Sequence, residues 1–193
     1  RSQLHVWNPE WTESDVWRRA FEELKTSGKV RAVGVSINDH QPDSALDLIE
    51  TGLIDSVQVI YNIFDQSPER NLFPLCQARD IGVLARVPLD EGSLAGTVDE
   101  RTVFPKGDFR EWYFRGDRKR QVAGRVAALR RDLEGVPGSL AEIALRFCIT
   151  HPAVSSVIPG MRKIRNVESS CGVSNSGPLD EETLGLLRKH AWD

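Results

Sequence analysis

The sequence predicts an α/β protein built on a parallel sheet. Two periodicities alternate along its 193 residues: short runs rich in valine and isoleucine, and longer segments with apolar residues three or four positions apart. A strand-like run and a helix-like segment recur about every 25 to 30 residues, which is typical of βαβ units. Hydrophobic residues make up 40% of the chain and charged residues 27%, so we expect a folded domain and exclude a mostly disordered chain.

The first half of the chain predicts four strands separated by three helices. The strands are the apolar or β-branched runs at 2–6, 30–36, 54–62 and 82–88. The helices have apolar residues at helical spacing or open with proline, and they lie at 12–26, 42–51 and 68–79. Gly28 and Gly52 stop the first two of these helices, as glycine often does.

The second half opens with a long stretch, 89–116, that has no clean period. Long irregular stretches in compact domains are usually functional loops. Helices are then expected at 117–133, 139–150, 162–171 and 179–190, with a fifth strand at 154–158. Ser139, followed three residues later by Glu142, is the pattern of a capping box.

This order of elements predicts a (β/α)8 barrel of which five βα units are present. The chain lacks the GxGxxG that opens the first helix of dinucleotide-binding doubly wound folds. A barrel needs eight strands and about 250 residues. We therefore expect the three remaining strands before Arg1, so that residues 1–193 form the C-terminal part of a single barrel domain.

Charge, hydropathy and cysteine usage exclude several classes of protein. No run approaches the roughly 18 apolar residues of a membrane span, and a net charge of −3 gives no basic field for nucleic acid. The three cysteines, Cys76, Cys148 and Cys171, form no CxxC pair, which argues against a zinc site or a disulfide framework. We expect a cytoplasmic protein in a reducing compartment, with no metal, membrane or nucleic-acid partner.

Seven segments resemble the aldo-keto reductase family, in the order in which that family has them. They are QLHVW at 3–7, GVSIN at 34–38, VQVIYN at 57–62, IGVLARVPL at 81–89 followed by GSLAG at 92–96, FPKGDFR at 104–110, SVIPGMR at 156–162 and LRKHAWD at 187–193. The resemblance implies strands four to eight of a TIM barrel of aldo-keto reductase type. It also implies NADPH-dependent reduction of carbonyl compounds at the C-terminal face.

The resemblance assigns one catalytic residue to this chain. In the family the fourth strand ends in a histidine beside the substrate carbonyl, and His5 matches it; a neutral imidazole can donate a hydrogen bond there. Trp7 is implied in the substrate wall. The family's proton-donating tyrosine, with its lysine and aspartate, lies on earlier strands, and neither Tyr61 nor Tyr113 matches the donor's motif. The 193 residues alone are therefore expected to be inactive. The structural alternatives are a barrel-rim histidine and a packed tryptophan.

Residues at the next three strand ends are implied in holding the nicotinamide. Ser36 and Gln58 match positions that bind its carboxamide, a task suited to hydroxyl and amide groups. Asn38 and Tyr61 are implied as further cofactor contacts. Arg86 falls where many members place an aromatic residue that stacks on the nicotinamide, and a guanidinium can also lie flat on a ring. Alternatively, Arg86 pairs with a phosphate or carboxylate, and Gln58 is a polar residue of the barrel interior.

Two further segments are implied in holding the phosphates. The first resembles the loop along the pyrophosphate, with contacts at Val87, Pro88, Leu89, Glu91 and Ser93. The second resembles the segment that holds the adenosine 2′-phosphate, with contacts at Ile158, Gly160, Met161, Arg162, Asn166 and Ser170. Arginine pairs well with phosphate, and backbone N–H groups at the start of the following helix add affinity for an anion. The alternative for the second segment is a solvated basic helix end.

Two functional hypotheses follow. The first is a reductase that transfers hydride from NADPH, with NADH as the alternative cofactor, to a small-molecule aldehyde or ketone. The second is a catalytically inactive half-barrel or nucleotide-binding module that self-associates through its open edges, because unpaired strand edges tend to pair with another chain.

Overall fold

The structure of the chain, a computed structural model, describes residues 2–192. Arg1 and Asp193, the two ends of the predicted domain, lie outside the described residues. The chain forms two compact units. Unit 1 consists of residues up to 61, 65–86 and 151–158, and unit 2 consists of residues 62–64, 87–150 and those from 159 onward.

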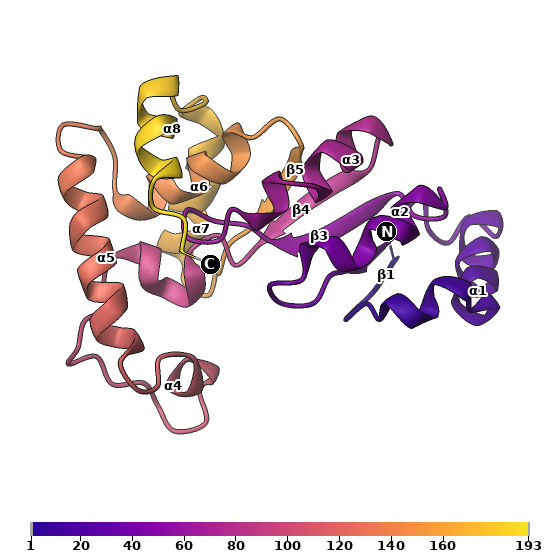
Figure 1. The fold of residues 1–193 in the computed structure, drawn as a ribbon, viewed down its shortest axis with the longest axis horizontal. Helices are drawn as coiled ribbons and strands as arrows, with labels where there is room; N and C mark the ends of the chain where they lie inside the picture. Colours follow the sequence, from indigo (N-terminus) through magenta and orange to yellow (C-terminus); the bar gives the residue numbers. More distant parts are fainter. Residues whose placement is uncertain (1, 193) are drawn as a thin grey trace. The chain divides into compact units, whose positions relative to one another are not determined.

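Unit 1 contains a parallel sheet whose five strands lie side by side in chain order (Figure 1). The strands are β1 (Ser2–Leu4), β2 (Val33–Ser36), β3 (Ser56–Ile60), β4 (Gly82–Arg86) and β5 (Val154–Ile158). Every neighbouring pair is parallel. The predicted fold class is therefore confirmed: five strands of an α/β sheet, as expected for an incomplete (β/α)8 barrel.

The two faces of this sheet differ in chemistry. Valines that are at most 2% exposed form one face: Val33, Val35, Val57, Val59 and Val83. Strand register places mostly polar residues on the other face: Gln3, Ser36, Gln58, Leu84, Arg86 and Ser156. The apolar face supplies the core of unit 1, and the polar face is available for chemistry.

Helices α1 (Asp15–Thr26), α2 (Leu46–Glu50) and α3 (Leu72–Ala78) complete unit 1. Each is preceded by a 3₁₀ turn with a proline in its first positions: η1 (Pro9–Glu13), η2 (Pro42–Ala45) and η3 (Ser67–Glu69). The predicted helix 68–79 is split because Pro74 lacks an N–H and fits only the first turn, so α3 begins at Leu72. The predicted helix 12–26 begins at Asp15, because the Ser14 hydroxyl accepts a hydrogen bond from Val16 N and caps it.

Unit 2 is helical. It contains α4 (Phe109–Tyr113), α5 (Arg118–Asp132), α6 (Leu140–Thr150), α7 (Ile164–Gly172) and α8 (Glu181–Arg188), with 3₁₀ turns η4 (Asp90–Ala95) and η5 (Val173–Asn175). Glu142 N donates to the Ser139 hydroxyl at 3.2 Å, which confirms the predicted N-cap of α6. Val122, Leu129 and Phe147 are buried and form part of its core.

The stretch 89–116 is less irregular than its sequence suggests. It contains η4 and the short helix α4, which the sequence did not predict. Helix α4 starts where Asp108 accepts a hydrogen bond from Arg110 N at 2.9 Å. The predicted strand 82–88 ends at Arg86 because Val87 has a φ of 54°, outside the β region.

Residues 2–192 contain neither a membrane-spanning helix nor a cluster of metal-binding side chains. No helix there is long and apolar enough to cross a membrane. No group of three or more histidine, cysteine, aspartate or glutamate side chains is arranged to hold a metal ion in that range.

Candidate cofactor site

Two glutamine side chains meet across β2 on the polar face of the unit 1 sheet. Gln3 Nε2 donates to Gln58 Oε1 at 3.1 Å, so side chains from β1 and β3 meet across the intervening strand. Gly34 pairs with Gln3 on one side and with Ser56 on the other, and a Cβ at this position would collide with the carbonyl and hydroxyl oxygens of Ser56. The absent side chain lets β2 and β3 approach each other at Ser56.

Ser36 carries an unsatisfied hydroxyl at the end of β2. The residue is 1% exposed, and its Oγ has no hydrogen-bond partner among the described residues. Gln58 lies next to it in the strand register and is half-buried. Buried hydroxyls without a partner are rare in proteins, and each calls for an explanation such as a missing ligand. The pair offers a hydroxyl at the carboxyl end of β2 and an amide in the middle of β3, on one face of the sheet. Parallel sheets bind ligands near the carboxyl ends of their strands.

Arg86 ends β4 and reaches the loop after β2. Its Nη2 donates to the Ile37 carbonyl at 3.1 Å and to Asp39 Oδ1 at 2.5 Å. The arginine side chain is 18% exposed, whereas that of Asp39 is 65% exposed. In the structure, Arg86 is therefore paired with a carboxylate.

The residues after β1 have contrasting environments. His5 is exposed directly after the strand, and the next residue, Val6, has a φ of 67°. Trp7 is fully buried, with its ring 6.0 Å from that of Trp11 and 5.6 Å from that of Trp17. Asn38 Nδ2 donates to the Trp7 carbonyl at 2.9 Å. Trp7 and Asn38 therefore take part in packing and in fixing this loop, whereas His5 is open to solvent.

Tyr61 and Ile158 lie in different environments within unit 1. The Tyr61 hydroxyl donates to Glu69 Oε1 at 2.6 Å, and its ring packs against Phe73 and His151. Tyr61 is 1% exposed. Ile158, the last residue of β5, is 42% exposed and lies beside Arg86 in the register. The structure thus brings Ser36, Gln58, Arg86 and Ile158 to one sheet face and places the Tyr61 ring among helix-packing residues.

In unit 2, residues 87–96 form a tight loop with an unusual backbone. Positive φ angles occur at Val87, Asp90 and Glu91 as well as at two glycines. A left-handed backbone costs a non-glycine residue about 1–2 kcal/mol. The Val87 carbonyl accepts hydrogen bonds from Asn62 Nδ2 and Asp90 N, each at 3.0 Å. Strained loops of this kind are concentrated at ligand sites.

Ser93 in this loop resembles Ser36 in the sheet, because its hydroxyl is also buried and unsatisfied. It is fully buried, and its Oγ has no partner within residues 2–192. Pro88 is buried and Leu89 and Glu91 are half-buried, so much of the predicted phosphate loop is shielded. The acidic Asp90 is 5% exposed and lies in the centre of the loop.

The predicted 2′-phosphate segment leads into α7. Gly160, Met161 and Arg162 are exposed, whereas Asn166 and Ser170 are half-buried on the helix. No acidic residue occupies the first turn of α7, and no side chain caps it. The helix dipole and the neighbouring Arg162 favour an anion at such an end.

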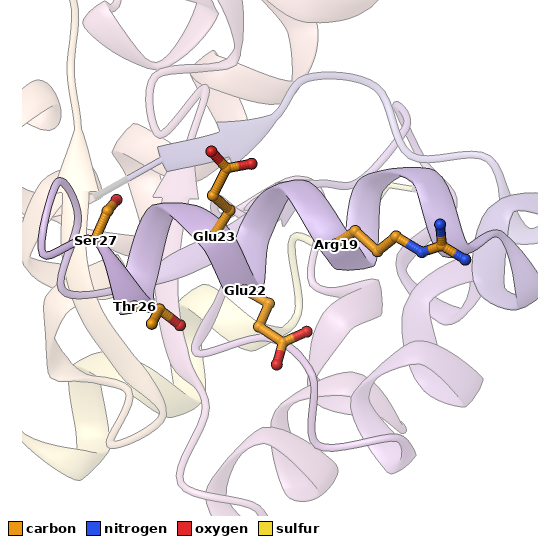
Figure 2. A pocket seen from close by; sticks show the side chains of 5 residues that line it. All are labelled: Arg19, Glu22, Glu23, Thr26 and Ser27. Carbon is orange, nitrogen blue, oxygen red and sulfur yellow. The ribbon is translucent and has the colours of Figure 1, made fainter.

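Two surface hollows lie elsewhere on unit 1. One is lined by Arg19, Glu22, Glu23, Thr26 and Ser27 of α1 and its C-cap. Figure 2 shows Glu22 and Glu23 pointing to opposite sides of the helix, so these groups do not converge on a ligand. The other lies between η2 and η3 and is lined by polar groups that include His40 and Asp43. Neither includes a residue of the predicted site.

The comparison with known sequences identifies the class of protein. A sequence profile of the aldo/keto reductase family matches residues 2–191, and the chain belongs to this family. The chain is 40% identical over 173 residues to the NADH-specific methylglyoxal reductase of Escherichia coli, a match that covers 89% of this chain and 52% of that protein. It is 30% identical over 175 residues to the uncharacterized oxidoreductase YqkF of Bacillus subtilis, covering 89% of this chain and 53% of that protein.

Solved structures agree on the fold. The holo form of the aldo-keto reductase AKR11C1 from Bacillus halodurans superposes with a TM-score of 0.74 at 27% identity, over 98% of this chain and 57% of that one. The glycerol dehydrogenase AKR11B4 from Gluconobacter oxydans gives a TM-score of 0.78 at 24% identity, over 97% and 57%, and supports the fold alone. The chain thus spans about half the length of the relatives that it matches.

Proposed function

We propose that this chain provides the cofactor-holding groups and the histidine of an NADPH-dependent reductase of aldehydes and ketones. One observation carries the proposal: Ser36, at the carboxyl end of β2, has a buried hydroxyl without a partner among residues 2–192 and lies next to Gln58 in the strand register. Its family supports a nicotinamide cofactor. The residues present fit this group, because a carboxamide accepts from a hydroxyl and exchanges hydrogen bonds with an amide.

Unit 1 is proposed to hold the nicotinamide end. Bound NADPH supplies a hydride to the substrate carbonyl carbon. Ser36 and Gln58 hold the carboxamide and so fix which face of the ring is presented. Arg86, held by Asp39, borders the same sheet face and restricts the position of the ring. His5 donates a hydrogen bond to the carbonyl oxygen and stabilises the charge that develops on it.

Unit 2 is proposed to hold the phosphate end. The backbone and Ser93 of the 87–96 loop bind the pyrophosphate. Arg162 and the N–H groups at the start of α7 bind the adenosine 2′-phosphate. Arg162 is the basis for preferring NADPH. NADH is the alternative, and the printed name of the E. coli relative, an NADH-specific enzyme, makes it the necessary comparison.

Proton delivery requires groups that no residue of this sequence matches. The family's tyrosine, lysine and aspartate have no counterpart in the seven matching segments. We therefore propose that reduction at a useful rate needs those three residues in addition to this chain. Methylglyoxal, the aldehyde in the name of the E. coli relative, is a suitable first substrate.

The test is a calorimetric titration of the chain with NADPH and with NADH. Ser36→Ala should weaken binding about fivefold, the effect of losing one hydrogen bond of about 1 kcal/mol. Ser44→Ala is a matched control, because Ser44 also has a buried hydroxyl with no partner in the described part of the chain but lies outside the predicted site. Equal affinities for the wild type and both variants, or no binding of either nucleotide, would refute the proposal.

A second candidate is a self-associating half-barrel. It is favoured by the edges of the described sheet, where β1 pairs only with β2 and β5 pairs only with β4. Ser155, Ser156 and Ile158 of β5 are exposed. Sedimentation velocity across a range of concentrations tests it: a concentration-dependent dimer supports edge pairing, and a strict monomer excludes it.

A further inference from the structure

The loop that is proposed to bind the pyrophosphate contains a buried carboxylate, that of Asp90. It is 5% exposed, has a φ of 46°, and lies three residues after Val87 in the 87–96 loop. A buried carboxylate is costly unless it is paired, and an unpaired one would repel a phosphate. The contacts of Asp90 therefore determine whether the loop can accept an anion.

A tyrosine and an arginine from the following segment pair with this carboxylate. The Tyr113 hydroxyl, at the end of α4, donates to Asp90 Oδ1 at 2.5 Å. Arg118 Nη2, in the first turn of α5, donates to the Tyr113 hydroxyl at 2.5 Å and lies 3.9 Å from Asp90 Oδ1. The tyrosine thus accepts from a cation and donates to an anion. All three residues belong to unit 2.

Two aromatic rings lie against the Arg118 guanidinium. Its guanidinium lies 4.2 Å from the centre of the Tyr113 ring and 4.9 Å from that of Trp192. Trp192 N donates to the Phe64 carbonyl at 2.6 Å, which ties the end of the chain to the same unit. Arg118 is therefore held in place by two rings rather than extended freely into solvent.

The protonation state of Tyr113 suits this arrangement. Burial, and then the neighbouring Asp90 carboxylate, raise the pKa of Tyr113 well above its usual range. Its hydroxyl stays protonated through neutral pH and remains a donor to Asp90.

We propose that Asp90, Tyr113 and Arg118 form a clamp that holds the 87–96 loop in its left-handed conformation and neutralises its buried carboxylate, so that the loop accepts the pyrophosphate of the cofactor. This inference rests on the proposed function. The three are positioning residues, because they act through the loop and not on the reacting atoms. The clamp assigns a function to the segment 97–118, whose helix α4 the sequence pattern did not reveal.

Neighbouring charges of the same segment support this assignment. Arg110 on α4 is influenced by the charge of Glu91 in the loop, and Asp108 is influenced by the charge of Arg162. These are the smallest of the influences on the pKa values of Arg110 and Asp108, and they indicate only that the α4 segment lies within range of charges in both predicted phosphate-binding segments.

The test compares Tyr113→Phe and Arg118→Gln with Arg120→Gln. Arg120 is also on α5, but its ion pair is with Asp117 at the surface, so it controls for the loss of a cation. Tyr113→Phe removes one oxygen and preserves the ring. Hydrogen exchange of the 87–96 amides reports the loop, and titrations with NADPH and with adenosine 2′-monophosphate, which lacks the pyrophosphate, report binding.

The clamp predicts faster exchange at 87–96 and about five- to tenfold weaker NADPH binding in Tyr113→Phe and Arg118→Gln. Affinity for adenosine 2′-monophosphate should be unchanged, and Arg120→Gln should match the wild type throughout. Equal loss for both ligands, or NADPH affinities that equal the wild type, would overturn the inference. If the wild type binds no nucleotide, the proposed function fails and the binding role of the clamp fails with it; the exchange rates still decide whether the three residues hold the loop.

Discussion

The strand ends of unit 1 and the 87–96 loop of unit 2 present similar groups by different means. In the sheet, Ser36 at the end of β2 and Gln58 in the middle of β3 occupy regular backbone, and the alternation of the strand directs their side chains. In the loop, Ser93 follows a run of left-handed residues that other side chains hold in place. Sheet geometry is therefore sufficient to position the side chains of unit 1, whereas the 87–96 loop depends on tertiary contacts with α4 and α5.

The largest effect is expected where sheet geometry leaves no room. Gly34→Ala should lower the free energy of unfolding by about 2 kcal/mol or more, because its Cβ would collide with the backbone of Ser56. Gly124→Ala, on α5 with open space around it, should raise the free energy by about 0.5–1 kcal/mol. Urea unfolding of both variants measures the contrast. A harmless Gly34→Ala would show that the close approach of β2 and β3 is not required.

Two ion pairs of unit 1 should differ in their contribution to stability. Arg86→Gln should cost about 1–3 kcal/mol, because it leaves the Ile37 carbonyl and Asp39 without their half-buried cation. Arg79→Gln removes an exposed pair with Glu50 and should cost less than about 1 kcal/mol. Thermal or urea unfolding gives both values. Equal costs would mean that the Arg86 pair is an ordinary surface contact.

These contrasts also indicate what the sequence can reveal. Apolar and β-branched runs located all five strands, glycine stops marked helix ends, and the matching segments singled out Ser36 at the end of β2 and Gln58 within β3. They missed α4, because its five residues are too few for a period and its start depends on the Asp108 cap. They also missed the Asp90 clamp, because Tyr113 lies 23 residues from Asp90 and no local pattern connects them.

A pH effect is expected at Asp65, which joins two loops of unit 1. Burial tends to raise the pKa of Asp65, but hydrogen bonds with His40 and Ser67 outweigh it and hold the pKa below its usual value of 3.8. The stabilisation should therefore be complete above pH 3.8 and lost as the pH falls through the folded-state pKa. The difference in unfolding free energy between the wild type and Asp65→Asn should shrink over that range. Asp47→Asn, exposed on α2, serves as the control; a difference that does not change with pH would contradict the assignment.

The smallest expected effect is a difference in reactivity among the three thiols, which involves no change in stability. Burial raises the pKa of Cys76 to about 12 and raises that of Cys148 as well, so neither forms the reactive thiolate readily. Cys171 is exposed on α7. A colorimetric thiol titration of the native chain should therefore show one fast-reacting group and two that react only after unfolding. Two or three fast thiols would indicate a looser core in either unit.

Amide hydrogen exchange of the chain with and without NADPH tests most directly which segments hold the cofactor. If the unit 1 sheet holds the nicotinamide, the cofactor should slow exchange at residues 34–38 and 56–60. If the loop of unit 2 holds the pyrophosphate, exchange should slow at 87–96, and helix α1 should be unchanged in either case. If saturating nucleotide protects none of these segments, or protects only other segments, the assignment of cofactor binding to them is contradicted.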